Sequence, residues 1–161
     1  MEIREATAAD WPAIWPIVQA VCRAGETYTY PREPDEAFGR RLWMMEPPGA
    51  TLVAVEGGQV LGTAKTGPNQ MGPGAHMATA SFMVAEDARG RGVGRALGEA
   101  VIARARAAGY RAMQFNAVVE SNHAAVHLWK ALGFEIIGTV PEAFAHPGGG
   151  LVGLHVMHRR L

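Results

Sequence analysis

The sequence has little cysteine, no excess of charge and no long apolar run. Cys22 is the single cysteine, so no internal disulfide can form, and a cytoplasmic protein is the natural expectation. The 15 Lys and Arg residues balance 15 Asp and Glu residues. We therefore expect no general attraction for nucleic acid or for an anionic membrane. No apolar run reaches the ~18 residues of a membrane-spanning helix, and the charged N-terminus lacks a signal-peptide core.

Length and composition predict one globular domain over residues 1–161. The chain is 48% hydrophobic and 19% charged, which is too apolar for a disordered protein and sufficient for a real core. No internal repeat or linker divides it. Cys22 lies within an apolar helical pattern, which favours a buried, inert thiol over a nucleophile. We expect no metal site.

Apolar periodicity and turn residues predict seven strands and four helices. We expect strands at 1–6, 51–55, 59–65, 76–84, 112–119, 134–140 and 153–159. The first helix should follow Thr7 or Asp10 and end at Gly25. The second should span roughly 35–46 and the third 92–108. The fourth should run from Ser121 or Asn122 to Gly133. A run of strands followed by alternating strands and helices indicates a mixed α/β (α+β) protein, with a central twisted sheet flanked by helices.

Three finer expectations concern local structure. Pro16 should kink or divide the first helix, because proline removes a backbone hydrogen bond. The second helix should turn Phe38, Leu42 and Met45 toward the core. Residues 141–150, which end in three glycines, should form a loop.

The most informative stretch runs from Ser81 to Leu97. It reads as an apolar strand, a polar elbow, a glycine loop and the start of an Ala-rich helix. The loop consists of Arg89, Gly90, Arg91, Gly92, Val93, Gly94 and Arg95. A helix N-terminus offers unpaired N–H groups, and glycines let the backbone approach a phosphate closely. This stretch therefore predicts an anion site, and its arginines would suit a phosphorylated cofactor.

The spacing of the glycines decides which of the known phosphate-binding motifs this loop matches. A dinucleotide-binding G-x-G-x-x-G would need glycine where the chain has Arg95 or Leu97, and a P-loop would need a Gly-Lys-Ser/Thr that is absent. The pattern R-x-x-G-x-G, at Arg89, Gly92 and Gly94, resembles the pyrophosphate loop of the GNAT acetyltransferase superfamily. In that family, backbone amides of the loop hold the diphosphate of acetyl-CoA. A Gly-Arg-rich loop before a surface helix is the alternative.

A second motif lies one strand after the loop. The segment from Asn122 to Phe134, NHAAVHLWKALGF, resembles the other GNAT signature, N-x-x-A-x-x-L-Y-x-x-L-G-F. With two motifs in the right order and a matching order of elements, the chain is identified as a member of this superfamily. The resemblance implies the GNAT fold. The sheet should splay between strands 76–84 and 112–119, because a helix diverges on each side, and ligands of open α/β sheets enter at such gaps.

The resemblance also implies a reaction: transfer of an acetyl group from acetyl-CoA to an amine by direct attack in a ternary complex. Backbone groups of Met83 and Val84 would hold the pantetheine arm, and Asn122 would hydrogen-bond it from the other side. An N–H near Met83 or Val84 would stabilise the oxyanion. The family's usual proton donor, the tyrosine of the second motif, is Trp129 here. Indole donates a hydrogen bond but releases no proton at useful pH, so Trp129 either steadies the sulfur or packs in the core.

A narrower resemblance concerns the acceptor. The stretches 88–99 and 115–122 resemble the branch that includes the fungal L-azetidine-2-carboxylate acetyltransferase. Resemblance to that branch implies that Asn116 holds the carboxylate of the substrate. Thr79 stands at a position where members of the branch have a further asparagine. Asn116 interrupts an apolar strand, and a buried amide needs partners. Tyr28 and Tyr30 lie in a loop. This loop either forms a wall of the acceptor pocket or is an ordinary loop held in place by the two tyrosine rings.

No general base stands out from the sequence. The candidates by chemistry alone are Glu26, Glu33, Glu120, His76, His127 and His146. Two other functions remain open: a non-catalytic acyl-CoA-binding module, suggested by the missing tyrosine, and a peptide N-terminal acetyltransferase, which would need an open groove beside residues 141–150. The expected partners are acetyl-CoA and a small amine, with a homodimer as an open alternative.

Overall fold

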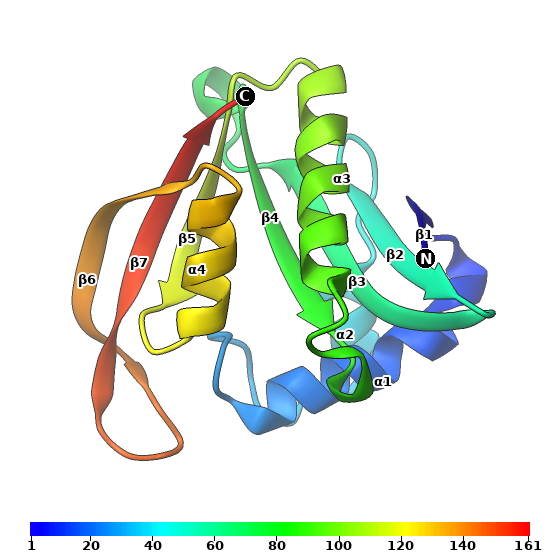
Figure 1. Cartoon of the computed structure of the whole chain (residues 1–161), viewed down its shortest axis with the longest axis horizontal. Helices are drawn as coiled ribbons and strands as arrows, with labels where there is room; N and C mark the ends of the chain where they lie inside the picture. Colours follow the sequence, from blue (N-terminus) through cyan, green and yellow to red (C-terminus); the bar gives the residue numbers. More distant parts are fainter.

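A single mixed sheet organises the chain, and the computed structural model describes all 161 residues (Figure 1). Its strand order is β1-β2-β3-β4-β5-β7-β6. The strands are β1 (Glu2–Glu5), β2 (Ala50–Glu56), β3 (Gln59–Pro68), β4 (Met77–Val84), β5 (Ala112–Val119), β6 (Glu135–Ala145) and β7 (Leu151–Arg160). Every neighbouring pair is antiparallel except β4 and β5, which are parallel. The predicted seven-strand mixed sheet is confirmed.

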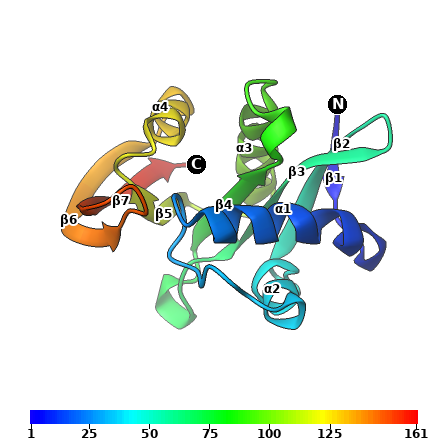
Figure 2. The same cartoon turned by 90° about the horizontal axis from the view of Figure 1, so that it is seen from below.

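The helices cover both faces of this sheet. They are α1 (Trp11–Ala24), α2 (Glu36–Trp43), α3 (Val93–Ala107) and α4 (His123–Ala131). Figure 2 shows α1 and α2 on one face and α3 and α4 on the other. One hydrophobic cluster lies under α3 and α4, and a second, built around Trp11, Ile14 and Trp43, lies under α1 and α2. None of the helices is long and apolar enough to cross a membrane.

The first helix is not divided at Pro16, although division was one of the two effects expected of this proline. α1 runs without interruption from Trp11 to Ala24, and Gly25, which has a left-handed φ of 65°, follows it as the cap. Pro16 lies early in the helix, so the missing N–H removes only the bond that the Pro12 carbonyl would have accepted. Ile14 and Val18, on either side of it, are fully buried. Their burial maintains the helix despite the proline.

The buried face of α2 also differs from the expected one. Gly39 and Trp43 are buried, whereas Phe38 and Leu42 are half-buried and Met45 is exposed beyond the end of the helix. Gly39 lies so close to the Trp15 ring that an added Cβ would come within 2.3 Å of it. Contact with α1 and burial of Trp43, rather than the spacing of its own apolar residues, set the rotation of this short helix about its axis.

The expected loop at 141–150 is largely strand. β6 continues to Ala145, and only residues 146–150 turn back into β7. A shift of register between Val140 and Phe144 accommodates Pro141, and Glu142 has a positive φ of 52° there. β6 is the outermost strand of the sheet. An edge strand tolerates a proline at a bulge because no further strand needs the missing N–H.

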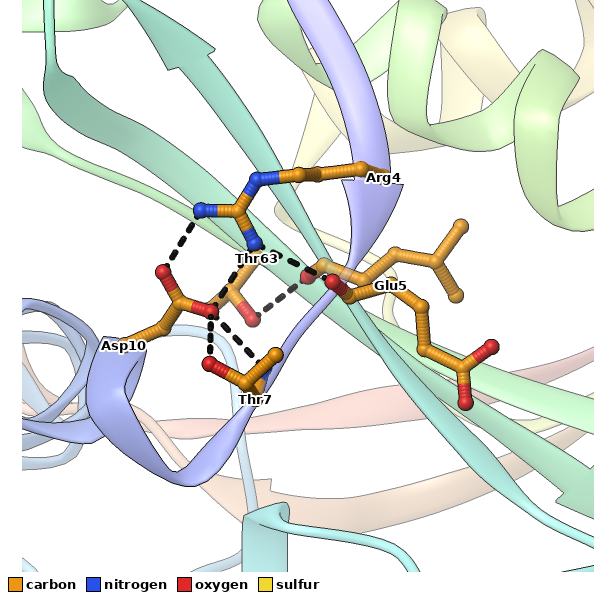
Figure 3. A network of polar contacts seen from close by, with 6 residues as sticks. Arg4, Glu5, Thr7, Asp10 and Thr63 are labelled. Carbon is orange, nitrogen blue, oxygen red and sulfur yellow. Dashed lines mark hydrogen bonds and ion pairs between the residues drawn. The ribbon is translucent and has the colours of Figure 1, made fainter.

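A polar network fixes the entry into α1 (Figure 3). Arg4 donates two hydrogen bonds to the Asp10 carboxylate, at 2.7 and 2.9 Å. The backbone N–H of Thr7 and its hydroxyl donate to the same carboxylate, at 2.7 and 3.0 Å. The Arg4 guanidinium, aided by Thr7, holds the pKa of Asp10 well below its usual range, although burial opposes the shift. Asp10 therefore joins β1 to the first helix as an anion.

Asp10→Asn should lower the free energy of unfolding by about 1 kcal/mol at pH 7, a typical value for a lost cap at a pair that water still screens. Because the folded-state pKa of Asp10 is depressed, its contribution is complete above the unfolded pKa of about 4 and is lost at lower pH. Urea titrations of both proteins at several pH values measure this. A stability difference that stays constant below pH 4 would contradict the expectation.

Candidate active site

Strands β4 and β5 pair only where they begin. Met77 pairs with Ala112 and Ala78 with Met113, and no further pair joins the two strands. Beyond this point β4 is paired with β3 alone and β5 with β7 alone, so the strands diverge (Figure 1). The predicted splay is confirmed.

A cavity of about 880 Å³ fills the gap between these strands. Its walls come from both strand edges, the start of α3, one side of α4 and residues 26–30. Sites for small molecules commonly have ~300–1,000 Å³. All predicted site residues except Arg91 line it: Tyr28, Tyr30, Thr79, Met83, Val84, Arg89, Gly90, Gly92, Val93, Gly94, Arg95, Asn116, Asn122 and Trp129.

The hydrogen bonds of the β3–β4 ladder show which backbone groups of β4 face the cavity. At one end, the Asn69 N–H donates to the Met77 carbonyl at 2.7 Å, and at the other the Ala85 N–H donates to the Leu61 carbonyl at 2.9 Å. Between these ends the register is continuous. Bonding alternates along an antiparallel pair, so the odd-numbered residues of β4 face β3 and the even-numbered ones face the gap.

Phe82 and Val84 therefore present their backbone N–H and C=O groups to the cavity. The Met83 backbone is directed to β3, and its side chain is only 1% exposed. The expectation that Met83 offers free backbone groups is not met, because the strand alternation places them inside the sheet. The Val84 N–H is directed at the cavity, and Phe82 is a neighbour that the sequence reading missed.

Tyr28 occupies the free edge of β4 at Phe82. Its hydroxyl donates to the Phe82 carbonyl at 2.6 Å and accepts from the Phe82 N–H at 2.8 Å. The ring stacks on Tyr30 with centroids 5.1 Å apart and meets Trp43 edge-on. Burial raises the pKa of Tyr28, so the phenol stays neutral. The tyrosine pair therefore closes one end of the cavity.

The glycine loop directs free N–H groups at the cavity. Gly90 and Gly92 have φ values of 76° and 80°, a left-handed conformation that favours glycine. The first helical hydrogen bond of α3 is donated by the N–H of Ala96 to Gly92. The four preceding N–H groups, from Gly92 to Arg95, have no acceptor in the protein. Such a cluster at the positive end of a helix is a site for a phosphate group.

The three loop arginines have different surroundings. Arg91 forms an ion pair with Glu56 and points away from the cavity. Arg95 lies 3.7 Å from Glu99, one helical turn further on. Arg89 lines the cavity and has no carboxylate partner. Arg89 is therefore the arginine best placed for a phosphate, and the Arg91 side chain does not face the site that was predicted for it.

Helix α4 contributes Asn122 and Trp129 to the opposite wall. The Asn122 side-chain oxygen accepts from the Ala125 N–H at 3.2 Å and caps α4, which leaves its NH₂ group available to a ligand. Trp129 is 7% exposed and packs against Phe82 and Phe115, with centroids 4.6 and 4.9 Å away. Its indole N–H has no protein acceptor but is not sealed from solvent. Trp129 is thus both a core residue and a wall of the cavity.

Asn116 is exposed, not buried as the apolar strand pattern suggested. Its side-chain oxygen accepts from Gln114 at 2.9 Å, and its NH₂ donates to Asn69 at 2.7 Å. β5 is irregular at this point, and its pairing with β7 breaks between Phe115 and Val118. Thr79, the other predicted acceptor residue, is half-buried on β4 and also lines the cavity.

Lys65 is a site residue that the sequence reading missed. It lies on β3 opposite Ser81, and both line the cavity. Burial lowers the pKa of Lys65 to about 8. The available signal was a lone cation within the otherwise uncharged strand from Gln59 to Pro68. Among the six candidate bases only Glu26 lines the cavity, and the others lie elsewhere.

Comparisons with known proteins agree with this geometry. The profile of the Acetyltransferase (GNAT) family matches residues 4–134. An L-methionine sulfoximine/L-methionine sulfone acetyltransferase of Pseudomonas paraeruginosa is 34% identical over 145 residues, which are 87% of this chain and 83% of that protein.

Solved structures share the whole fold. A GCN5-related N-acetyltransferase from Kribbella flavida is 58% identical, with a TM-score of 0.96 over 99% of this chain and 97% of that one. A GNAT phosphinothricin acetyltransferase from Sinorhizobium meliloti, in complex with acetyl-CoA, is 26% identical, with a TM-score of 0.86 over 99% and 88% of the two chains. The chain belongs to the GNAT family of acetyltransferases, and its acetyl donor is acetyl-CoA.

Proposed function

We propose that this acetyltransferase acts on the amine of a small amino or imino acid. The observation that carries the proposal is the cavity itself, which joins the open edge of β4 to a polar pocket walled by Tyr28 and Tyr30. The tyrosine pair limits the size of an acceptor. The relatives named for methionine sulfoximine, methionine sulfone and phosphinothricin support an amino acid analogue as the acceptor class.

The proposed cofactor contacts follow from the free backbone groups. The N–H groups from Gly92 to Arg95, with Arg89, would hold the diphosphate of acetyl-CoA. The pantetheine arm would add to the free edge of β4 at Val84, with the Asn122 NH₂ facing it from α4.

The proposed chemistry is direct attack of a neutral amine on the thioester carbon. A C–N bond forms to give a tetrahedral oxyanion, the attacking nitrogen passes its proton to water, and the C–S bond breaks as the oxyanion collapses. The N–H of Val84 would stabilise that oxyanion. Trp129 would donate a hydrogen bond to the sulfur without transferring a proton, so the CoA thiolate leaves unprotonated or takes its proton from water.

The acceptor proposal includes a ring secondary amine beside a carboxylate, as the narrower resemblance implies. Asn116 and Thr79 line the acceptor side of the cavity and offer neutral donors. A peptide acceptor would need an open groove, and the segment beyond Pro141, which pairs with β7 at Phe144 and Ala145, does not by itself supply one. The non-catalytic alternative does not survive membership of this enzyme family.

CoA release across a panel of amines tests this function. We expect turnover with small amino or imino acids, including L-methionine sulfone and azetidine-2-carboxylate, and little with peptides or polyamines. Asn116→Ala should lower kcat/KM for carboxylate acceptors by roughly 5-fold or more while leaving acetyl-CoA affinity unchanged. Turnover of peptides or polyamines alone would overturn the proposal.

A further inference from the structure

The side chain of Lys65 projects from β3 on the same face as α1 and α2. Directly opposite residues of an antiparallel pair share a face, and Thr63 and Met83 form the pair two residues along from Lys65 and Ser81. Met83 is buried against α1 and α2, and side chains two residues apart share a face. Lys65 therefore enters the cavity from the side on which Tyr30 lies.

Three groups hold the Lys65 ammonium in place. It donates to the Leu42 carbonyl, in the last turn of α2, at 2.7 Å. It also lies 5.5 Å from the centroid of the Tyr30 ring and 5.4 Å from that of Trp43. An ammonium has three donors, so two N–H groups remain after the bond to Leu42. The ammonium group is therefore fixed in position while two of its hydrogen-bond donors remain unpaired.

No carboxylate neutralises this charge. The ion pairs of the protein involve Asp10, Glu5, Glu33, Glu56 and Glu99, and none of them includes Lys65. A cation removed from water without a partner is costly, and such a group binds an anion strongly when one arrives. Asn116 is a weaker candidate for an anion, because it is exposed and already bonded to two side chains.

We propose that Lys65 binds the carboxylate of the acceptor and selects amino and imino acids over neutral amines. The proposal rests on the proposed function and deepens it. The two free N–H groups of the ammonium take the carboxylate, and Ser81, which is directly opposite on β4 and also lines the cavity, offers its hydroxyl as a further donor. The acceptor class is then a small molecule that carries an amine and a carboxylate.

A purely structural role for Lys65 makes a different prediction. If the lysine only joins α2 to β3 through Leu42, its loss should affect all acceptors alike through stability. Lys65→Gln separates the two roles, because glutamine keeps an N–H donor for the Leu42 carbonyl and removes the charge. Lys65→Met removes both. The only other lysine, Lys130, is exposed on α4 outside the cavity, which makes Lys130→Gln the matched control.

The experiment compares an accepted amino acid with its own carboxamide in a CoA-release assay. In Lys65→Gln and Lys65→Met we expect KM for the acid to rise about 10- to 100-fold, the effect of losing a charged hydrogen bond. KM for the carboxamide, kcat and acetyl-CoA affinity should stay within about 2-fold, so the preference for the acid disappears. Lys130→Gln should behave as the unmodified enzyme does.

Two results would overturn the proposal, and a third concerns the function on which it rests. Equal losses for the acid and the carboxamide would show a structural role, as would an unchanged preference in Lys65→Gln. If Lys65→Met does not fold, as judged by its unfolding transition, Lys65→Gln and the charge-retaining Lys65→Arg decide, and Lys65→Arg should keep the preference. Absence of turnover with any carboxylate acceptor in the unmodified enzyme would refute the proposed function itself.

Discussion

Gly92→Val is expected to weaken acetyl-CoA binding by about 100-fold or more, since each hydrogen bond to a charged phosphate contributes about 1.5–3 kcal/mol and more than one is lost. Gly92 lies at the N-cap of α3 with φ 80° and ψ 4°. An added Cβ would meet no protein atom within 4 Å. Because Gly92 lines the cavity beside the free N–H groups of the loop, we expect this Cβ to obstruct the approach of a phosphate.

A valine at position 92 also strains the backbone, which requires a matched control. Left-handed φ costs a residue with a Cβ about 1–2 kcal/mol, and a β-branched residue somewhat more. Gly109 follows α3 at its other end, with φ 83° and equally open space around its Cβ. Gly109→Val should therefore show a similar loss of stability without any change in cofactor affinity.

Calorimetric titration with acetyl-CoA measures the affinities, and urea unfolding measures the stabilities. If Gly92→Val binds acetyl-CoA as tightly as Gly109→Val does, the loop is not the diphosphate site. The comparison is informative because the two variants differ in position and share the same local strain.

The parts of this site that could be predicted are those encoded by local backbone conformation. The loop from Arg89 to Arg95 needs positive φ at Gly90 and Gly92, and glycine is the residue that supplies it. Asn122 is a preferred capping residue and does cap α4. Because both features depend on neighbours within a few residues, the sequence pattern was sufficient to place the cavity between β4 and β5.

The features that the sequence did not predict depend on contacts between distant segments. Pro141 is compatible with β6 only because that strand is the edge of the sheet, which no local pattern records. Asn116 is exposed beside a break in the pairing of β5 with β7. The Lys65 ammonium is held in position by Leu42, Tyr30 and Trp43, which belong to a distant helix and loop. Tertiary structure decided each of these.

The second large effect is expected at Trp129, where Trp129→Ala should lower the free energy of unfolding by about 3–5 kcal/mol. The indole is the centre of an aromatic group with Phe82, Phe115 and Phe134. A Cβ added to Gly98 of α3 would come within 3.2 Å of the Trp129 ring, so α3 and α4 pack closely through this ring. Removing it leaves a large hole between the two helices that flank the cavity.

Trp129→Phe separates this packing role from catalysis. Phenylalanine keeps most of the apolar volume, so the stability loss should be much smaller, and it removes the N–H that would face the sulfur. We expect a modest loss of kcat, of roughly 3- to 10-fold, the typical effect of losing one neutral hydrogen bond of about 0.5–1.5 kcal/mol.

The pH dependence of kcat distinguishes a hydrogen-bond donor from an acid. Because indole does not titrate in the accessible range, Trp129→Phe should lower the profile without changing its shape. Trp11→Phe is the matched control, since Trp11 is also buried, 3% exposed, but lies outside the cavity and donates its N–H to Glu36. It should leave kcat unchanged. If a titrating limb of the profile disappears in Trp129→Phe and remains in Trp11→Phe, proton transfer depends on Trp129, and the leaving thiolate is not released in the way proposed.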